Sequence, residues 1–173
     1  MRFRTDPWRR RIKPIRFLIA ILAAITLAGC YTSEKPLISD DESVAPYAKM
    51  TFQGQGASDS PAEFTRDGKH YTTKDNDGTL LRLNLKPDGD YYIAQLGGKS
   101  GDKDQYLYGY LKLDAGAGTA LAYRTFGTKD DARDGLRACN DVICIDNLDA
   151  YLAYARAAAA ANKPDTTFKF TAE

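Results

Sequence analysis

The chain has one histidine, His70, which could act as a general base. Neither a G-x-S-x-G nor an H-E-x-x-H sequence surrounds it, so no nucleophile or metal motif accompanies it. Carboxylates alone can hydrolyse glycosides, because one can act as the acid and another as the base or nucleophile. The sequence therefore favours a binding or structural role over an enzyme, with a carboxylate-dependent hydrolase as the alternative.

A possible metal site is equally weak in the sequence. The segment 74–78, KDNDG, resembles the start of a calcium-binding loop, but the glutamate that should follow at a distance does not complete the pattern. A zinc site needs about four ligands, and a single histidine supplies few of them. We expect a plain turn at 74–78, and neither a metal nor a cofactor.

Tyrosines form the most conspicuous candidate binding surface. In the segment 104–113, DQYLYGYLKL, strand alternation places Tyr106, Tyr108 and Tyr110 on one face. An exposed stripe of this kind can stack on sugar rings or anchor a protein, since each ring is apolar and each tip is polar. Alternatively, the stripe lies under a C-terminal helix or completes a second small core.

The first 29 residues have the organisation of a secretory signal peptide. Residues 1–16 contain seven of the 24 basic residues of the chain and one acid, and residues 17–29, FLIAILAAITLAG, carry no charge. A membrane-spanning helix needs about 20 apolar residues, so this apolar segment is too short to span. We therefore expect export of the remaining chain.

The end of that segment, Leu27-Ala28-Gly29-Cys30, resembles the lipobox of bacterial lipoproteins. The resemblance covers residues 1–30 and implies that the Cys30 thiol receives a diacylglyceryl group through a thioether. It further implies cleavage before Cys30 and, in many cases, acylation (with palmitate, for example) of the new amine. The alternative is an ordinary secreted protein cut near Gly29, with Cys30 left as a thiol.

Two or three acyl chains would hold the protein on a membrane permanently, because each buried CH₂ contributes roughly 0.8 kcal/mol. Residue 31 is Tyr, whereas Asp at this position retains enteric-type lipoproteins in the inner membrane. The resemblance thus implies the periplasmic face of the outer membrane.

The other two cysteines, Cys139 and Cys144, are expected to form a disulfide, since an exported protein meets an oxidising compartment. Closing so short a loop stabilises the fold by roughly 2 kcal/mol in the chain-entropy picture. Two reduced, buried cysteines are the alternative.

The chain after residue 29 contains 17 basic and 22 acidic residues. This acidic balance argues against nucleic acid or an anionic bilayer as the main partner, since both require a basic surface. Residues 31–45 are polar and acidic, and we expect the lipidated N-terminus to continue as a flexible tether over 30–45. Residues 46–173 are long enough for one domain with its own core.

Strand-like segments follow one another through this domain. We expect strands at 46–52, 69–73, 79–85, 90–96, 104–113 and 119–126, with Asp88-Gly89 in a hairpin turn. The intervening segments, including 54–63 and 97–103, are expected to be loops. A helix is predicted over 147–161, capped by Asp146, and a last edge strand over 168–172.

The predicted fold is α+β and mainly β: an antiparallel meander forming a barrel or half-barrel, with one C-terminal helix. The expected protein is a membrane-anchored periplasmic module that contacts an envelope protein or cell-wall glycan. Small β-barrel lipoproteins that inhibit lysozyme have a similar architecture, but their motifs are missing from this sequence.

Overall fold

The computed structural model describes residues 30–55, 60–75, 78–100 and 103–173. The expected signal peptide and the centre of the KDNDG turn lie outside these residues. The elements, in chain order, are β1 (Tyr31–Ser33), β2 (Lys49–Gln53), β3 (Ala62–Asp67), β4 (His70–Lys74), β5 (Leu80–Asp88), β6 (Tyr91–Ser100), β7 (Lys103–Asp114), β8 (Thr119–Tyr123), η1 (Lys129–Asp131), β9 (Leu136–Cys139), β10 (Val142–Ile145), α2 (Leu148–Ala160) and β11 (Thr166–Ala172).

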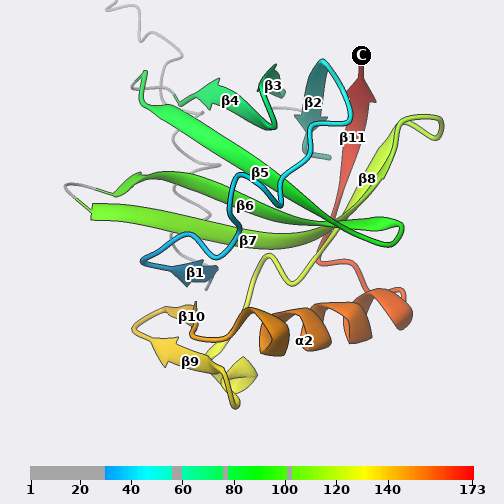
Figure 1. Ribbon diagram of the computed structural model, residues 1–173. Coiled ribbons are helices and arrows are strands. Elements are labelled where there is room, and N and C mark those ends of the chain that lie inside the picture. Colours follow the sequence, from blue (N-terminus) through cyan, green and yellow to red (C-terminus); the bar gives the residue numbers. More distant parts are fainter. Residues whose placement is uncertain (1–29, 56–59, 76–77, 101–102) are drawn as a thin grey trace, which may run out of the picture.

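Within the described residues, eight antiparallel strands close into a barrel (Figure 1). Strands β2 to β8 follow one another around it, and β11 joins β8 to β2. This confirms the predicted mainly β fold with a C-terminal helix. The last strand is not an edge strand as expected, because it pairs on both sides and completes the barrel.

The hairpin between β5 and β6 turns at Gly89, which has φ of 62°. Asp88 pairs with Tyr91, so the two turn residues are Gly89 and Asp90. Left-handed backbone of this kind favours glycine, which is why the Asp-Gly pair marks the turn.

Two predicted loops contain strand instead. Strand β3 begins at Ala62, inside the predicted loop 54–63, although Phe64 is its one buried residue and the other five are exposed. Strands β6 and β7 also extend through most of the predicted loop 97–103. Neither segment carries the apolar alternation that predicts strands, because each lies where the barrel wall faces solvent.

The barrel interior forms the first core. Its buried side chains alternate with outward residues along the strands and comprise Met50, Phe64, Tyr71, Leu83, Leu85, Ala94, Leu111, Ala120, Ala122 and Phe170. Several aromatic rings meet at one side of this core: Phe52 lies 5.1 Å from Phe170 and 5.8 Å from Phe64, measured between ring centroids. The interior is thus filled by side chains.

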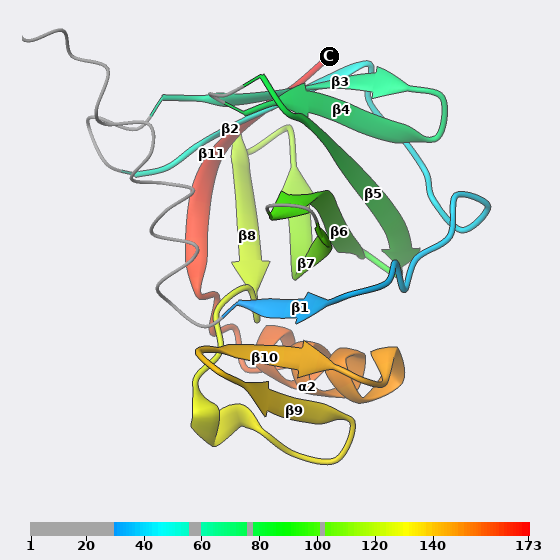
Figure 2. The ribbon, with the colours of Figure 1, turned by 90° about the vertical axis from the view of Figure 1, so that its left-hand side faces the viewer.

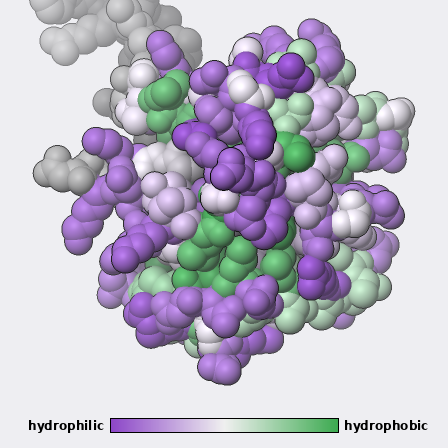
Figure 3. Space-filling view, viewed as in Figure 1, coloured by the Kyte–Doolittle hydropathy of each residue, from purple (hydrophilic) through white to green (hydrophobic). Residues whose placement is uncertain are grey.

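The outer face of β6, β7 and β8 supports a second core. It is covered by α2 and by β1, β10 and β9, which extend the sheet beyond β7 (Figures 1 and 2). Figure 3 shows hydrophobic residues reaching the surface between the barrel and α2, where this core lies. Two hydrophobic layers therefore share the same strands.

The helix agrees with the predicted 147–161 to within a residue or so, but its cap differs. The Asn147 side chain, rather than that of Asp146, accepts hydrogen bonds from the backbone N–H groups of Asp149 and Ala150. Asp146 instead accepts two hydrogen bonds from Arg137. In the alanine run that ends the helix, Ala158 and Ala159 are buried.

The segment 31–45, expected to be a flexible tether, is folded onto the barrel. Tyr31–Ser33 is a strand with every residue buried, Ile38 is 2% exposed, and Val44 bridges to Leu85. The polar composition of this segment is misleading because several of its polar side chains, those of Asp40, Glu42 and Ser43, bond to residues of β5. No helix among the described residues is long and apolar enough to cross a membrane.

A charged contact joins the barrel to the helix. Arg156 donates to both carboxylate oxygens of Asp88, over 2.6 and 2.8 Å, and the Tyr110 hydroxyl donates to the same carboxylate over 2.7 Å. The hydrogen bonds from Arg156, and then that from Tyr110, hold the pKa of Asp88 below its usual range.

Because the pKa of Asp88 is lowered on folding, its stabilising effect is present above the unfolded value of about 4 and is lost as the pH falls through the folded value. We expect Asp88→Asn to lower the free energy of unfolding by about 1 kcal/mol at pH 7 and by nearly nothing at the acid end. Urea unfolding across this pH range measures the difference. Asp90→Asn, at the exposed neighbour in the turn, is the control, and an equal effect of both variants would contradict the role given to Asp88.

Candidate functional site

The structure divides the predicted tyrosine stripe. Tyr108 and Tyr110 are each 3% exposed and belong to the second core, whereas Tyr106 is half-buried at its border. The prediction of an exposed face of three tyrosines is therefore wrong, and the alternative, that the stripe completes a second core under the helix, is correct. Tyr106 is the member of the stripe that a ligand could still reach.

Tyr108 helps to hold the N-terminal segment on the barrel. Its hydroxyl lies 2.9 Å from the Ser33 hydroxyl and 2.9 Å from Oε1 of Gln95. The same Gln95 oxygen accepts the backbone N–H groups of Leu37 and Ile38 over 2.7 and 2.8 Å. Gln95 is 3% exposed, so these buried polar groups depend on one another for hydrogen bonds.

A groove opens where this segment crosses β5, β6 and β7. Its volume is about 340 Å³, and it is lined by Pro36, Ile38, Ser39, Asp40, Arg82, Asn84, Gln95 and Tyr106. One wall comes from the segment once expected to be a tether, and the floor comes from the outer face of the barrel. The groove therefore exists only because residues 36–40 are folded.

Tyr106 forms an aromatic wall of this groove. It pairs with Gly97 across β7 and β6, and Gly97 pairs in turn with Arg82 on β5. A Cβ atom at Gly97 would lie 3.0 Å from Cε1 of Tyr106, so the glycine lets the ring lie close over β6. The result is an aromatic ring and a guanidinium group on one sheet face.

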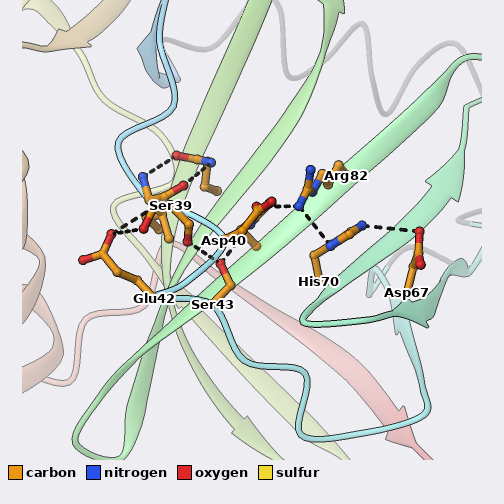
Figure 4. Close-up of polar contacts among 10 residues, drawn as sticks. Ser39, Asp40, Glu42, Ser43, Asp67, His70 and Arg82 are labelled. Atoms are coloured by element: carbon orange, nitrogen blue, oxygen red, sulfur yellow. Dashed lines mark hydrogen bonds and ion pairs between the residues drawn. The ribbon is translucent and has the colours of Figure 1, made fainter.

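A row of charged and polar groups continues from the groove toward β3 (Figure 4). Arg82 donates through one nitrogen to Asp40 and to Nδ1 of His70, the latter over 3.0 Å. Nε2 of His70 lies 3.4 Å from a carboxylate oxygen of Asp67. These groups come from separate segments of the chain, which the pairing of β3, β4 and β5 and the docking of the N-terminal segment bring together.

Both nitrogens of His70 are occupied in this row. Nδ1 can accept from Arg82 only when the ring proton is on Nε2, which faces Asp67. A general base needs a free nitrogen near the substrate, and here the ring instead positions Arg82. The arrangement places charged and polar groups in one row beside the groove.

Opposite charges set the protonation of the groove wall. The hydrogen bond from Arg82 is the main reason that the pKa of Asp40 lies below its usual range. Next to it, a hydrogen bond from Lys86 and one from the backbone of Ser39 lower the pKa of Glu42 to about 2. Asp40 in the wall and Glu42 beside it are therefore carboxylates throughout the physiological pH range.

Asn84 and Ser43 link this wall to the floor. The Asn84 amide donates to Asp40 over 3.2 Å and to the Ser43 hydroxyl over 2.8 Å, and that hydroxyl donates to the Ser39 carbonyl over 2.9 Å. Asn84 and Gln95 stand among apolar residues in the sequence, and such isolated polar residues were the available signal for this site. Nothing in the spacing of Asp40, Arg82 and Gln95 predicts that they meet.

The three cysteines lie close together in the fold. Cys139 and Cys144 form the predicted disulfide, which closes the β9–β10 hairpin with a Cα–Cα distance of 5.8 Å. Cys144 pairs with Thr32 across β10 and β1. Cys30 precedes β1 and is 4% exposed, and this burial raises the pKa of its thiol to about 11. Within the described residues, no group of His, Cys, Asp or Glu side chains could hold a metal ion.

Comparison of the chain with protein-family models, with curated proteins and with solved structures found no match. The function is therefore inferred from the residues of the chain and from the groove.

The Gln95 side chain gives a direct test of the network that builds the groove. We expect Gln95→Leu to lower the free energy of unfolding by about 1–3 kcal/mol, because the N–H groups of Leu37 and Ile38 and the Tyr108 hydroxyl lose a buried acceptor. Denaturant unfolding measures this loss. Gln105→Leu on β7 is the matched control, and equal stabilities of the two variants would show that the network is unimportant.

Proposed function

We propose that this protein is a lipid-anchored binding module of the bacterial cell envelope, and that it binds cell-wall glycan in the groove beside Tyr106. The expected position is the periplasmic face of the outer membrane. The observation that carries the proposal of binding is the combination of an aromatic ring, an ion pair and two amides around one groove.

The support for the anchor is the lipobox-like sequence that ends at Cys30. A diacylglyceryl group would join the thiol through a thioether, and cleavage would leave Cys30 as the first residue. Because Cys30 is 4% exposed in the folded chain, acyl transfer would have to precede the docking of β1. The anchor and the fold would thus be established in a definite order.

The support for a glycan is the chemistry of the groove lining. The face of a sugar ring is apolar and packs on an aromatic ring, which Tyr106 supplies. Sugar hydroxyls need both donors and acceptors, and Arg82, Asn84, Gln95 and Asp40 supply them. A protein partner, or hydrolysis of an envelope polymer through carboxylates, would be the competing roles.

The anchor is tested by labelling growing cells with a clickable palmitate analogue. We expect the wild-type protein to be labelled, and we expect Cys30→Ser to lose the label and to accumulate as uncut precursor or leave the membrane fraction. Mass spectrometry of the N-terminus checks the modification. Unchanged labelling of Cys30→Ser would refute the lipobox assignment.

The groove is tested by sedimentation of the detergent-solubilised lipoprotein with purified peptidoglycan sacculi. We expect Tyr106→Ala and Arg82→Gln each to weaken binding about tenfold, which corresponds to roughly 1.4 kcal/mol. Tyr106→Phe, which keeps the ring, and Arg66→Gln, at an exposed arginine on β3 outside the groove, should bind nearly as wild type.

Other results of this assay would point elsewhere, provided that each variant melts cooperatively. Wild-type binding by all variants would exclude the groove as the site. Release of soluble glycan fragments would favour the hydrolase. Cross-linking of one dominant protein in intact envelopes, without sacculus binding, would favour a protein partner.

A further inference from the structure

The proposed attachment point is part of the sheet rather than the end of a tether. The carbonyl of Cys30 accepts the Ile143 N–H over 3.0 Å, and Cys30 forms an antiparallel bridge with Phe126. The next residue, Tyr31, is fully buried in β1 between β7 and β10. Hence no flexible residue separates the anchor from the folded domain.

This geometry limits how far the domain can lie from its membrane. A flexible tether of about 15 residues would have given an r.m.s. span of roughly 20 Å. With β1 docked at Tyr31, the acyl chains instead start at the edge of the domain where Cys30 and Phe126 meet, and the lipidated Cys30 side chain must turn outward from the 4% exposed position of the unmodified residue. That edge must therefore lie at the headgroup level.

Phe126 is well placed to meet the bilayer. It is 37% exposed, and together with Leu80 it forms the pair of large exposed hydrophobic residues in the described part of the chain. An aromatic side chain beside an acyl anchor adds apolar area that the membrane interface can bury.

The loop that carries Phe126 is held in place. Asp165 accepts the backbone N–H groups of Thr125 and Phe126 over 2.8 and 3.3 Å. Gly127 lies so close to β1 that a Cβ atom there would be 2.9 Å from Cζ of Tyr31. Phe126 is thus fixed relative to Cys30, as an orienting contact requires.

We propose that the edge formed by Cys30 and Phe126 docks on the lipid bilayer and sets one orientation of the barrel on the membrane. This inference rests on the lipid anchor of the proposed function. The start of β5, which carries Leu80, lies toward the opposite end of the barrel from β1 in both ribbon views, and it is therefore well separated from the proposed attachment point (Figures 1 and 2).

The chain offers a clean spectroscopic test because its one tryptophan, Trp8, lies in the segment removed before Cys30. Phe126→Trp and Leu80→Trp each introduce a single tryptophan into the processed lipoprotein. Both proteins are reconstituted into vesicles of phosphatidylethanolamine and phosphatidylglycerol with brominated acyl chains. We expect severalfold stronger quenching at position 126 than at position 80.

A spacer variant tests whether the short attachment causes the orientation. A flexible Gly-Ser segment of about 15 residues, inserted after Cys30, should keep the protein on floating vesicles but reduce quenching of Phe126→Trp toward that of Leu80→Trp. Floating vesicles with no quenching at position 126 in the spacer-free protein, or with equal quenching at both positions, would overturn the proposed orientation and leave the anchor intact. Failure to float, with no lipid on Cys30, would overturn the anchor itself and this inference with it.

Discussion

The pairing of β1 with β7 is the contact on which the two-layered architecture depends. One side of β7 is shared: Tyr110 to Asp114 pair with β8, while Tyr106 to Tyr108 pair with β1. β1 pairs with the part of the β7 edge that β8 does not reach, and β10 and β9 continue the sheet from β1. The disulfide hairpin therefore joins the barrel through the first three residues after Cys30.

The same strands serve two cores because alternate residues face opposite sides. Along β7, Leu111 points into the barrel, whereas Tyr108 and Tyr110 point toward α2. Near the other end of this outer face, the outward side chains are polar and include Gln95, Asn84 and Arg82. The candidate site is thus the polar continuation of a surface that elsewhere is core.

Local patterns predicted what local interactions determine. The meander, the hairpin after Asp88 and the helix follow from alternation, turn residues and helical spacing, and the disulfide follows from the oxidising compartment expected for an exported chain. The folding of residues 31–45 was missed, because its polar groups are satisfied by residues 57 and 58 positions away along the chain, as with Ile38 and Leu37 on Gln95. For the same reason, no spacing of residues in the sequence predicts the groove.

The short β1 strand also has a mechanical consequence. With the proposed lipid anchor on Cys30, a pull between membrane and domain would enter the fold at Cys30 and act first on the three residues of β1. The eight barrel strands close on one another without β1, so their closure bears none of this load directly. Under tension the hydrogen bonds of β1 to β7 and β10 would break before those of the barrel. The released residues would then lengthen the link between the membrane and the barrel.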